Sequence, residues 1–147
     1  MNGRGYFGIG VYHPKTAVNI GTLWRSALIF GADFIFTIGR RYNKQASDTL
    51  KTWRHVPLFN FQTFEEFQSS IPYDCILVYV ELADHSEGLD TFKHPERAVY
   101  LLGAEDNGIP EVLINGKRVI QIPGVNDFCL NVSVAGSIVM YDRLVKQ

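Results

Sequence analysis

The sequence has little cysteine, no long apolar run and no excess of charge of either sign. Its two cysteines, Cys75 and Cys129, are far apart in a chain of 147 residues, which argues against a disulfide scaffold and favours a reducing compartment. No apolar run approaches the roughly 18 residues that a membrane-spanning helix needs. The first residues also lack the apolar core of a signal peptide. We therefore expect a soluble cytoplasmic protein.

Several familiar site patterns are also missing. The four histidines are scattered and no Cys-x-x-Cys occurs, so no set of residues has the spacing of metal ligands. The sequence contains no Gly-x-Gly-x-x-Gly that follows an expected strand, as the dinucleotide-binding type does, and no phosphate-binding P-loop. We expect neither a metal centre nor a nucleotide site of these two types.

Charge is unevenly distributed, although the net charge is only -1. The segment 40–55 has a local charge of +4, because five basic residues stand there against Asp48 alone. A concentrated basic segment in a near-neutral protein is either a surface for a polyanion or a solvated loop. The five basic residues are Arg40, Arg41, Lys44, Lys51 and Arg54.

Apolar strands alternate with helical segments along the chain. The length and the 46% hydrophobic content fit one domain, residues 1–147, with a sizeable core. The alternation predicts an α/β fold, with a parallel sheet covered by helices on both faces. Apolar, β-branched and aromatic runs predict strands at residues 6–12, 34–38, 56–61, 74–80, 97–102 and 119–122.

Helices are expected between these strands. Apolar residues recur at helical spacing over 20–30, between Asn19 as a plausible cap and Gly31 as a stop. Thr63 and Glu66 resemble a capping box that opens a second helix, which ends before Pro72. A short helix is expected at 109–114, and the segment 84–93 is polar and irregular.

The last helix has an unusual sequence. Polar residues crowd its start, and Asn131 or Ser133 is the expected cap. Gly136 lies inside the helix, where a glycine costs about 1 kcal/mol relative to alanine. We therefore expect another part of the chain to pack very close to the backbone at Gly136.

Polar residues cluster after three of the expected strands, where ligands bind in open α/β sheets. The first cluster contains Asn19 and Arg25. Arg25 lies among apolar helical residues and needs a partner, so it either pairs with a carboxylate to hold the fold or faces a cleft. The second cluster follows Gly103 and contains Glu105, the natural partner of Arg25, with Asp106 as the alternative. The third is the start of the last helix.

Taken in order, the three clusters resemble the three motifs of the SpoU/TrmH branch of the SPOUT superfamily of RNA methyltransferases. The first motif is matched by Asn19-x-Gly-x-x-x-Arg25, and the second by Gly103-x-Glu105-x-x-Gly108. The third is matched by Ile122-Pro123 followed by Leu130-Asn131-Val-Ser-Val-Ala135. The resemblance covers nearly the whole chain, and its size is similar to the minimal, single-domain members of the family.

This resemblance implies a fold, a cofactor and an assembly. Family members have a parallel α/β sheet whose C-terminal part forms a deep trefoil knot. S-adenosylmethionine lies bent in the knot, and the first and last helices build a homodimer whose active sites draw residues from both subunits. Small residues at Gly124, Ala135 and Gly136 would let the threaded chain pass close to other backbone.

The resemblance also implies roles for individual residues. Arg25 matches the arginine proposed to activate the ribose 2′-hydroxyl, Glu105 the acidic residue that supports it, and Asn19 and Asn131 the residues that shape the site. The backbone positions expected to hold the cofactor are Gly103, Ile122 and Leu130, with the strand end at Val80 and Glu81. Cys129 stands where the family usually has serine. Since a thiol is a weaker hydrogen-bond donor than a hydroxyl, Cys129 is the main departure from the catalytic pattern.

The expected activity is therefore S-adenosylmethionine-dependent methylation of RNA, on the ribose 2′-hydroxyl and most simply of tRNA. The basic segment would be the RNA surface, with Tyr42 and Trp53 stacking on unpaired bases. Three alternatives stay open: a ribosomal RNA target, methylation of a base on the same fold, and a protein that binds RNA or cofactor without turnover.

Overall fold

The computed structural model describes residues 5–40, 42, 51–104, 108–126 and 128–147. Within these ranges no helix is both long enough and apolar enough to span a membrane.

A single parallel sheet runs through the described part of the chain. It has seven strands in the order β3-β2-β1-β6-β4-β7-β5, and every neighbouring pair is parallel. The predicted parallel α/β fold is therefore confirmed. The short strand β5 is an addition, since it lies in the segment expected to be irregular. The strands are β1 (Tyr6–Tyr12), β2 (Phe34–Ile38), β3 (Leu58–Phe61), β4 (Ile76–Val80), β5 (Glu87–Gly88), β6 (Arg97–Gly103) and β7 (Val119–Gln121).

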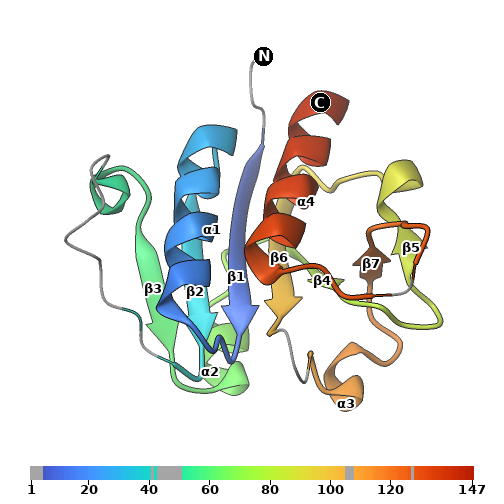
Figure 1. Ribbon diagram of the computed structural model, residues 1–147. Coiled ribbons are helices and arrows are strands. Elements are labelled where there is room, and N and C mark those ends of the chain that lie inside the picture. Colours follow the sequence, from blue (N-terminus) through green and yellow to red (C-terminus); the bar gives the residue numbers. More distant parts are fainter. Residues whose placement is uncertain (1–4, 41, 43–50, 105–107, 127) are drawn as a thin grey trace.

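Helices cover both faces of this sheet. The two long helices, α1 (Ala17–Phe30) and α4 (Val132–Lys146), lie side by side on one face (Figure 1). The hydroxyl of Ser137 on α4 donates a hydrogen bond to that of Ser26 on α1 at 2.7 Å. The short helices α2 (Phe64–Ser69) and α3 (Glu111–Ile114) pack on the other face, where Phe67 and Ile114 join the core. The described residues also form two single 3₁₀ turns, at Thr52–Arg54 and Leu89–Thr91.

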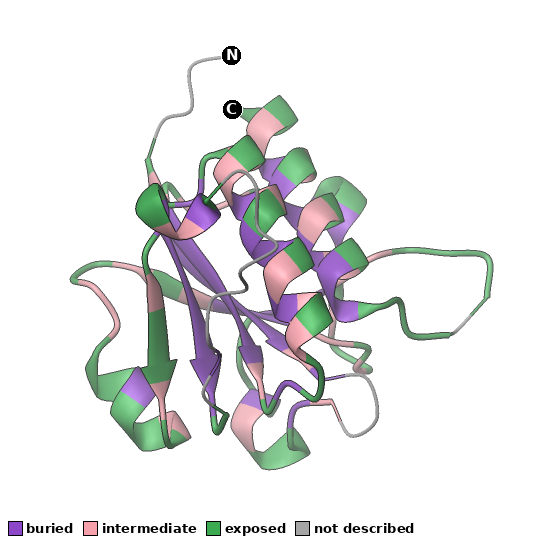
Figure 2. Ribbon diagram, turned by 60° about the vertical axis from the view of Figure 1, so that its left-hand side comes forward, coloured by how far each residue is buried: buried purple, intermediate pink, exposed green. Residues whose placement is uncertain are grey.

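The core has two layers because successive residues of a strand point to opposite faces. Ile9 and Val11 of β1 belong to the layer under α1 and α4. Gly8 and Gly10 face the other way, and a side chain at either position would overlap the ring of Phe34 or Phe36 on β2. The two glycines thus make room for large aromatic residues on the α2–α3 face. Figure 2 shows the resulting pattern, with buried strands between helices whose outer sides are exposed.

Local sequence signals account for several element ends. Thr63 Oγ1 accepts a hydrogen bond from the backbone N–H of Glu66 at 3.1 Å, which confirms Thr63 as the cap of α2, while Glu66 Oε2 accepts from the backbone N–H of Gln62. Gly31 ends α1 in the left-handed conformation, with φ of 85°. Asn131 caps α4, because its side-chain oxygen accepts from the backbone N–H groups of Ser133 and Val134.

One expected cap is wrong. The helix α1 begins at Ala17, after an extended Thr16, so Asn19 lies inside its first turn. The physical reason is that the amide of Asn19 is engaged elsewhere: its oxygen accepts a hydrogen bond from the side chain of Asn131 at 2.9 Å.

A buried polar network ties α4 to the rest of the domain near the C-terminus. Arg143 is 1% exposed and donates hydrogen bonds to the backbone oxygens of Pro95 and Glu96 and to the hydroxyl of Tyr100. The ring of His94 joins that hydroxyl to the carboxylate of Asp142, at 2.7 Å on each side. Burial lowers the pKa of His94, although the hydrogen bond and the charge of Asp142 act in the opposite direction. Burial likewise raises the pKa of Tyr100.

Candidate active site at the carboxyl ends of β4, β6 and β7

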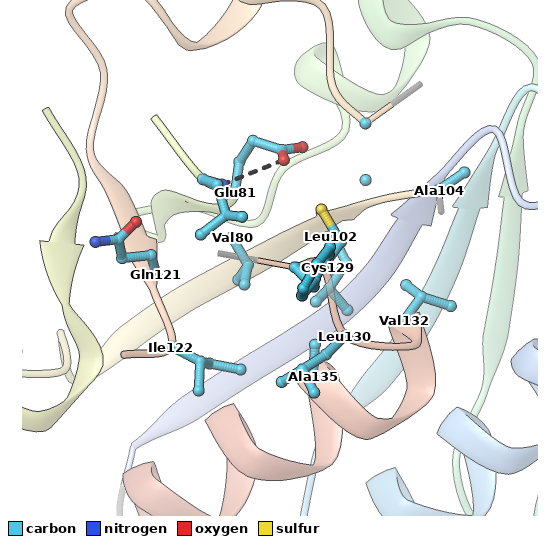
Figure 3. Close-up of a pocket in the computed structure, with 14 residues that line it drawn as sticks. Val80, Glu81, Leu102, Ala104, Gln121, Ile122, Cys129, Leu130, Val132 and Ala135 are labelled. Carbon is cyan, nitrogen blue, oxygen red and sulfur yellow. Dashed lines mark hydrogen bonds between the residues drawn. The ribbon is translucent and has the colours of Figure 1, made fainter. Parts of the chain in front are cut away.

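A pocket of about 260 Å³ opens where β4, β6 and β7 end, beside the loop that leads into α4 (Figure 3). This is slightly smaller than the roughly 300–1,000 Å³ of typical small-molecule sites. The five residues predicted to hold a cofactor come from three strand ends and the loop, and all five line this one pocket: Val80, Glu81, Gly103, Ile122 and Leu130. Fold and motif order together therefore bring these positions into one site.

The carboxylate of Glu81 is fixed at the wall of the pocket. It accepts hydrogen bonds from the backbone N–H of Ile109 at 2.9 Å and from that of Leu82 at 3.2 Å. A Cβ at Gly103 or Gly108 would lie 2.7 or 2.6 Å from Glu81 Oε2, and Gly108 has a positive φ of 60°. The two glycines of the second motif thus leave space for an acidic side chain from the neighbouring strand β4.

The loop between β7 and α4 forms the outer wall of the pocket. Its residues from Pro123 to Leu130 are exposed where they are described, and Phe128 is 84% exposed although it lines the pocket. Cys129 also lines the pocket, and its sulfur points inward (Figure 3). Gly124 has only ordinary contacts, because a Cβ there would lie 3.6 Å from the nearest atom. Close packing therefore does not explain this glycine, contrary to expectation.

Asn131 connects the pocket to the first helix. Its side-chain oxygen caps α4 and also accepts from the hydroxyl of Ser133 at 2.6 Å, while its amide nitrogen donates to Asn19. The residues before and after it, Leu130 and Val132, line the pocket. This cap therefore joins the first and third polar clusters, as their common placement beyond the strands predicts.

Arg25 has a different environment from the one expected. It is exposed on α1 rather than surrounded by apolar groups, and it does not line the pocket. No hydrogen bond or ion pair of Arg25 occurs with another described residue. Its proposed partner Glu105, like Asp106, lies outside the described residues. The arginine that is buried among apolar side chains is Arg143, which the sequence did not single out.

The basic segment is described only in part. Arg41 and Lys44 lie outside the described residues, whereas Arg40, Lys51 and Arg54 are exposed. Tyr42 is 8% exposed and packs edge-on against Trp24, so its expected stacking on an RNA base is wrong for this conformation. Trp53 is half-buried, with the guanidinium of Arg54 at 5.0 Å from its ring centre.

The sequence analysis did not assign a cofactor-binding role to the other residues that line the pocket. Leu82, Leu102, Ala104, Gln121, Val132 and Ala135 also face the pocket. Apolar residues at strand ends look like core residues in a sequence, and only their position beside the three motifs could have marked them. In the described part of the chain, no three His, Cys, Asp or Glu side chains are grouped as metal ligands would be.

Comparison with known proteins gives one family and many similar folds. The model of the SpoU rRNA methylase family matches residues 7–141. No curated protein sequence matches this chain.

Three solved structures illustrate the likeness of fold. An A. aeolicus TrmH/SpoU tRNA modifying enzyme is 17% identical, with a TM-score of 0.83 over 95% of this chain and 74% of that one.

The second structure is AviRb, a SpoU methyltransferase of Streptomyces viridochromogenes in complex with AdoMet. It is 17% identical, with a TM-score of 0.82 over 97% of this chain and 58% of that one. The third structure comes from work on the 2-OH methylation of C/U34 on tRNA. It is 23% identical, with a TM-score of 0.79 over 100% of this chain and 95% of that one.

Proposed function

The chain belongs to the SpoU rRNA methylase family, and from this premise we propose that it is an S-adenosylmethionine-dependent RNA methyltransferase that acts on the ribose 2′-hydroxyl, with tRNA as substrate. The observation that carries the proposal is the pocket at the carboxyl ends of β4, β6 and β7. There, all five residues expected to hold the cofactor lie together with Cys129, next to the Asn19–Asn131 hydrogen bond.

The pocket has the chemistry to hold S-adenosylmethionine. Apolar side chains of Leu102, Ile122 and Leu130 suit a flat purine ring, and the glycines at 103 and 108 allow a ligand to approach the backbone. The Glu81 carboxylate is a suitable partner for hydroxyl or ammonium donors. When bound, the cofactor supplies an activated methyl group on a sulfonium.

The residues of the chain then position the cofactor and the ribose hydroxyl relative to each other. Asn131 holds the start of α4 in place through its cap, and this fixes Leu130 and Cys129 at the pocket wall. Because the cofactor carries the driving force, correct placement of the ribose oxygen is the main contribution left to the protein.

Arg25 acts, in this proposal, at the pocket of a second subunit. It is exposed on α1 and away from the pocket of its own chain, as a residue contributed across a dimer would be. An arginine remains protonated, so its role is to orient the ribose hydroxyl and to stabilise developing negative charge. Glu105 would support Arg25.

The proposed homodimer uses the outer faces of α1 and α4. These faces carry exposed apolar residues on both helices, namely Val18, Ile29, Val134, Ile138 and Tyr141. Such a patch on adjacent helices is typical of a protein interface. We also propose the trefoil knot for the C-terminal part. In its support, the chain leaves β7, passes the pocket loop, and returns to pack α4 beside β6, two strands away.

RNA is the proposed second substrate. The exposed residues Arg40, Lys51 and Arg54 supply positive charge for phosphates, together with Arg41 and Lys44. A tRNA target is favoured by the structural likeness to the protein studied for tRNA methylation. The family name refers to ribosomal RNA, so an rRNA target is the second candidate.

Isothermal titration with S-adenosylmethionine tests the pocket. We expect the wild-type chain to bind the cofactor, and we expect Gly103→Val to abolish binding, because a side chain there overlaps the Glu81 carboxylate and the Gly108 backbone. Gly124→Val is the matched control, since residue 124 does not line the pocket and has room for a side chain. Equal binding by both variants would place the cofactor elsewhere.

A further inference from the structure

A second cavity of about 510 Å³ lies beside the pocket, at the carboxyl ends of β1 and β2. Ala104 and Gly108 line both spaces, so the pocket and this β1–β2 cavity are neighbours at these two residues. The opposite wall consists of the loop after β1 and the turn after β2. Its side chains include Tyr12, His13, Lys15 and Arg40.

Positive charge dominates this wall. Lys15 and Arg40 are exposed, and the described residues that line the cavity include no carboxylate. The Nη1 group of Arg40 donates to the backbone oxygens of Pro14 and Lys15, which anchors the guanidinium to the loop. Its Nε and Nη2 donors have no partner among the described residues. An anchored guanidinium with donors left over is suited to bind a phosphate.

The start of α1 adds to this character. The helix begins two residues after Lys15, its cap Thr16 makes no side-chain hydrogen bond to the helix, and its first turn has no acidic residue. The backbone N–H groups of a helix start carry partial positive charge. This partial charge has the same sign as Lys15, which lies next to the helix start in the sequence.

An aromatic pair forms another part of the wall. The rings of Tyr12 and His13 stack at 4.1 Å with an angle of 24° between their planes. His13 has a positive φ of 51°, a conformation that costs about 1–3 kcal/mol and is concentrated at functional sites. A Cβ at Gly39 would lie 2.7 Å from the His13 ring, so Gly39 leaves the space that the ring occupies. Stacked aromatic rings at a basic surface are typical of sites for unpaired bases.

We infer that the β1–β2 cavity holds the RNA nucleotide that is presented to the cofactor pocket, with a backbone phosphate on Arg40 and Lys15 and a base against the Tyr12–His13 pair. The inference rests on the proposed function. Methyl transfer requires the two reactants in direct contact, and Ala104 and Gly108, which line both spaces, show that the two sites are adjacent. The remainder of the basic segment, after Arg40, would then bind more distant parts of the RNA.

The test compares RNA binding by charge-neutralising variants of the full-length protein. Lys15→Gln, Arg40→Gln and the double variant are titrated against fluorescently labelled bulk tRNA at several salt concentrations. We expect the double variant to bind about 10–100-fold more weakly and the slope of log K against log salt to fall by about 1–2. Affinity for S-adenosylmethionine, measured by titration calorimetry, stays within about twofold because neither residue lines the cofactor pocket.

Lys93→Gln is the matched control. Lys93 is exposed and precedes β6, so it lies toward the amino ends of the strands, opposite the cavity. Its replacement by glutamine removes the same charge as Lys15→Gln does. The variant His13→Gly provides a second readout. It removes the ring and the unfavourable φ together, so it weakens tRNA binding without lowering the melting temperature. A purely structural role of His13 would instead lower the melting temperature and leave RNA affinity unchanged.

The outcomes separate this inference from the proposed function. If wild type binds cofactor and tRNA, and the Lys15 and Arg40 variants bind tRNA as tightly as Lys93→Gln does, the cavity is not the nucleotide site and the proposed function stands. If wild type binds cofactor but no RNA, the proposed function fails and the inference fails with it. Should Arg40→Gln unfold, because Arg40 anchors the loop, Lys15→Gln alone decides the matter by the same comparison.

Discussion

Gly136 lets α4 lie directly on α1 and β6. A Cβ at this position would overlap the methyl group of Leu23 Cδ1 and lie 3.2 Å from Leu102 Cδ1. The close approach expected from a glycine inside a helix is therefore present, and the approaching atoms are side chains of the core.

Gly136→Ala tests how much this contact matters. The new methyl group overpacks the core, and we expect the free energy of unfolding in urea to fall by about 1–3 kcal/mol. Alanine is the better helix former by about 1 kcal/mol, so a rise in stability would show that the core yields easily at this point. Gly124→Ala, on the exposed loop, is the control and should change stability by less than about 0.5 kcal/mol.

Cys129 raises the question whether a thiol can replace a hydroxyl at the pocket wall. We expect Cys129→Ser to change the rate of methyl transfer by less than about tenfold, equivalent to about 1.4 kcal/mol of barrier, since Asn19 and Asn131 hold the surrounding geometry. Cys129→Ala measures the packing contribution alone. A much larger gain with serine would mean that the natural residue impairs catalysis.

Two arginines show the limit of reading single residues from a sequence. Arg25 and Arg143 both stand among apolar neighbours on long helices, yet one is exposed and the other is 1% exposed. The difference comes from the oxygens of Pro95, Glu96 and Tyr100, which surround Arg143 in three dimensions. No spacing along the helix contains that information.

At the scale of elements, the start of α4 combines a stabilising cap with a hydrogen bond to α1. Asn131 caps the helix through its oxygen and binds Asn19 through its nitrogen. The two functions can therefore be separated by substitution.

Asn131→Ala removes both functions, and we expect a loss of about 1 kcal/mol of stability together with a loss of activity. Asn131→Asp retains an oxygen acceptor at the cap but cannot donate to Asn19 as the amide does. We therefore expect Asn131→Asp to unfold near the denaturant midpoint of the wild type. Its rate of methyl transfer should nevertheless be lower than that of the wild type. Full activity in Asn131→Asp would mean that the link to Asn19 is dispensable.

The network between α4 and the segment before β6 makes stability depend on pH. His94 is neutral in the native state because burial lowers its pKa below the ordinary value of 6.5. The unfolded chain accepts the proton more readily, so stability is complete above about pH 6.5 and declines as pH falls toward the native pKa.

Urea unfolding at about pH 7.5, 6.5 and 5.5 measures this effect. We expect the wild type to lose stability more steeply across that range than His94→Gln, in which the titrating group is absent. Identical pH profiles would show that His94 is protonated equally in both states. Lys146 and Arg143 also face His94, and their positive charges lower its pKa further.

The sequence predicted the ends of helices and strands correctly where contacts within a few residues determine them. The capping box at Thr63, the stop at Gly31 and the strands at 6–12 and 34–38 agree with the sequence prediction. The start of α1 did not, because Asn19 bonds to a residue 112 positions away. Likewise β5 pairs two residues of a polar segment with β7, which no local pattern predicts.

At the scale of the whole molecule, the parallel sheet explains why the site was predictable as a set of positions. Strand ends that lie side by side gather Val80, Glu81, Gly103 and Ile122, although up to 42 positions separate them in the sequence. The apolar lining residues and the second cavity depended on the full three-dimensional arrangement. The order β6-β4-β7, which brings the last two motifs together, is likewise a property of the fold.

The central claim is that this chain transfers a methyl group to a ribose 2′-hydroxyl of RNA. The most direct measurement is incubation of the full-length protein with S-adenosylmethionine labelled in its methyl group and RNA from cells that lack the gene, followed by mass spectrometry of the nucleosides. We predict a labelled 2′-O-methyl nucleoside in the tRNA fraction, absent from a parallel incubation with Gly103→Val. A label on a base, or no label in any RNA while the cofactor is bound, would contradict this account.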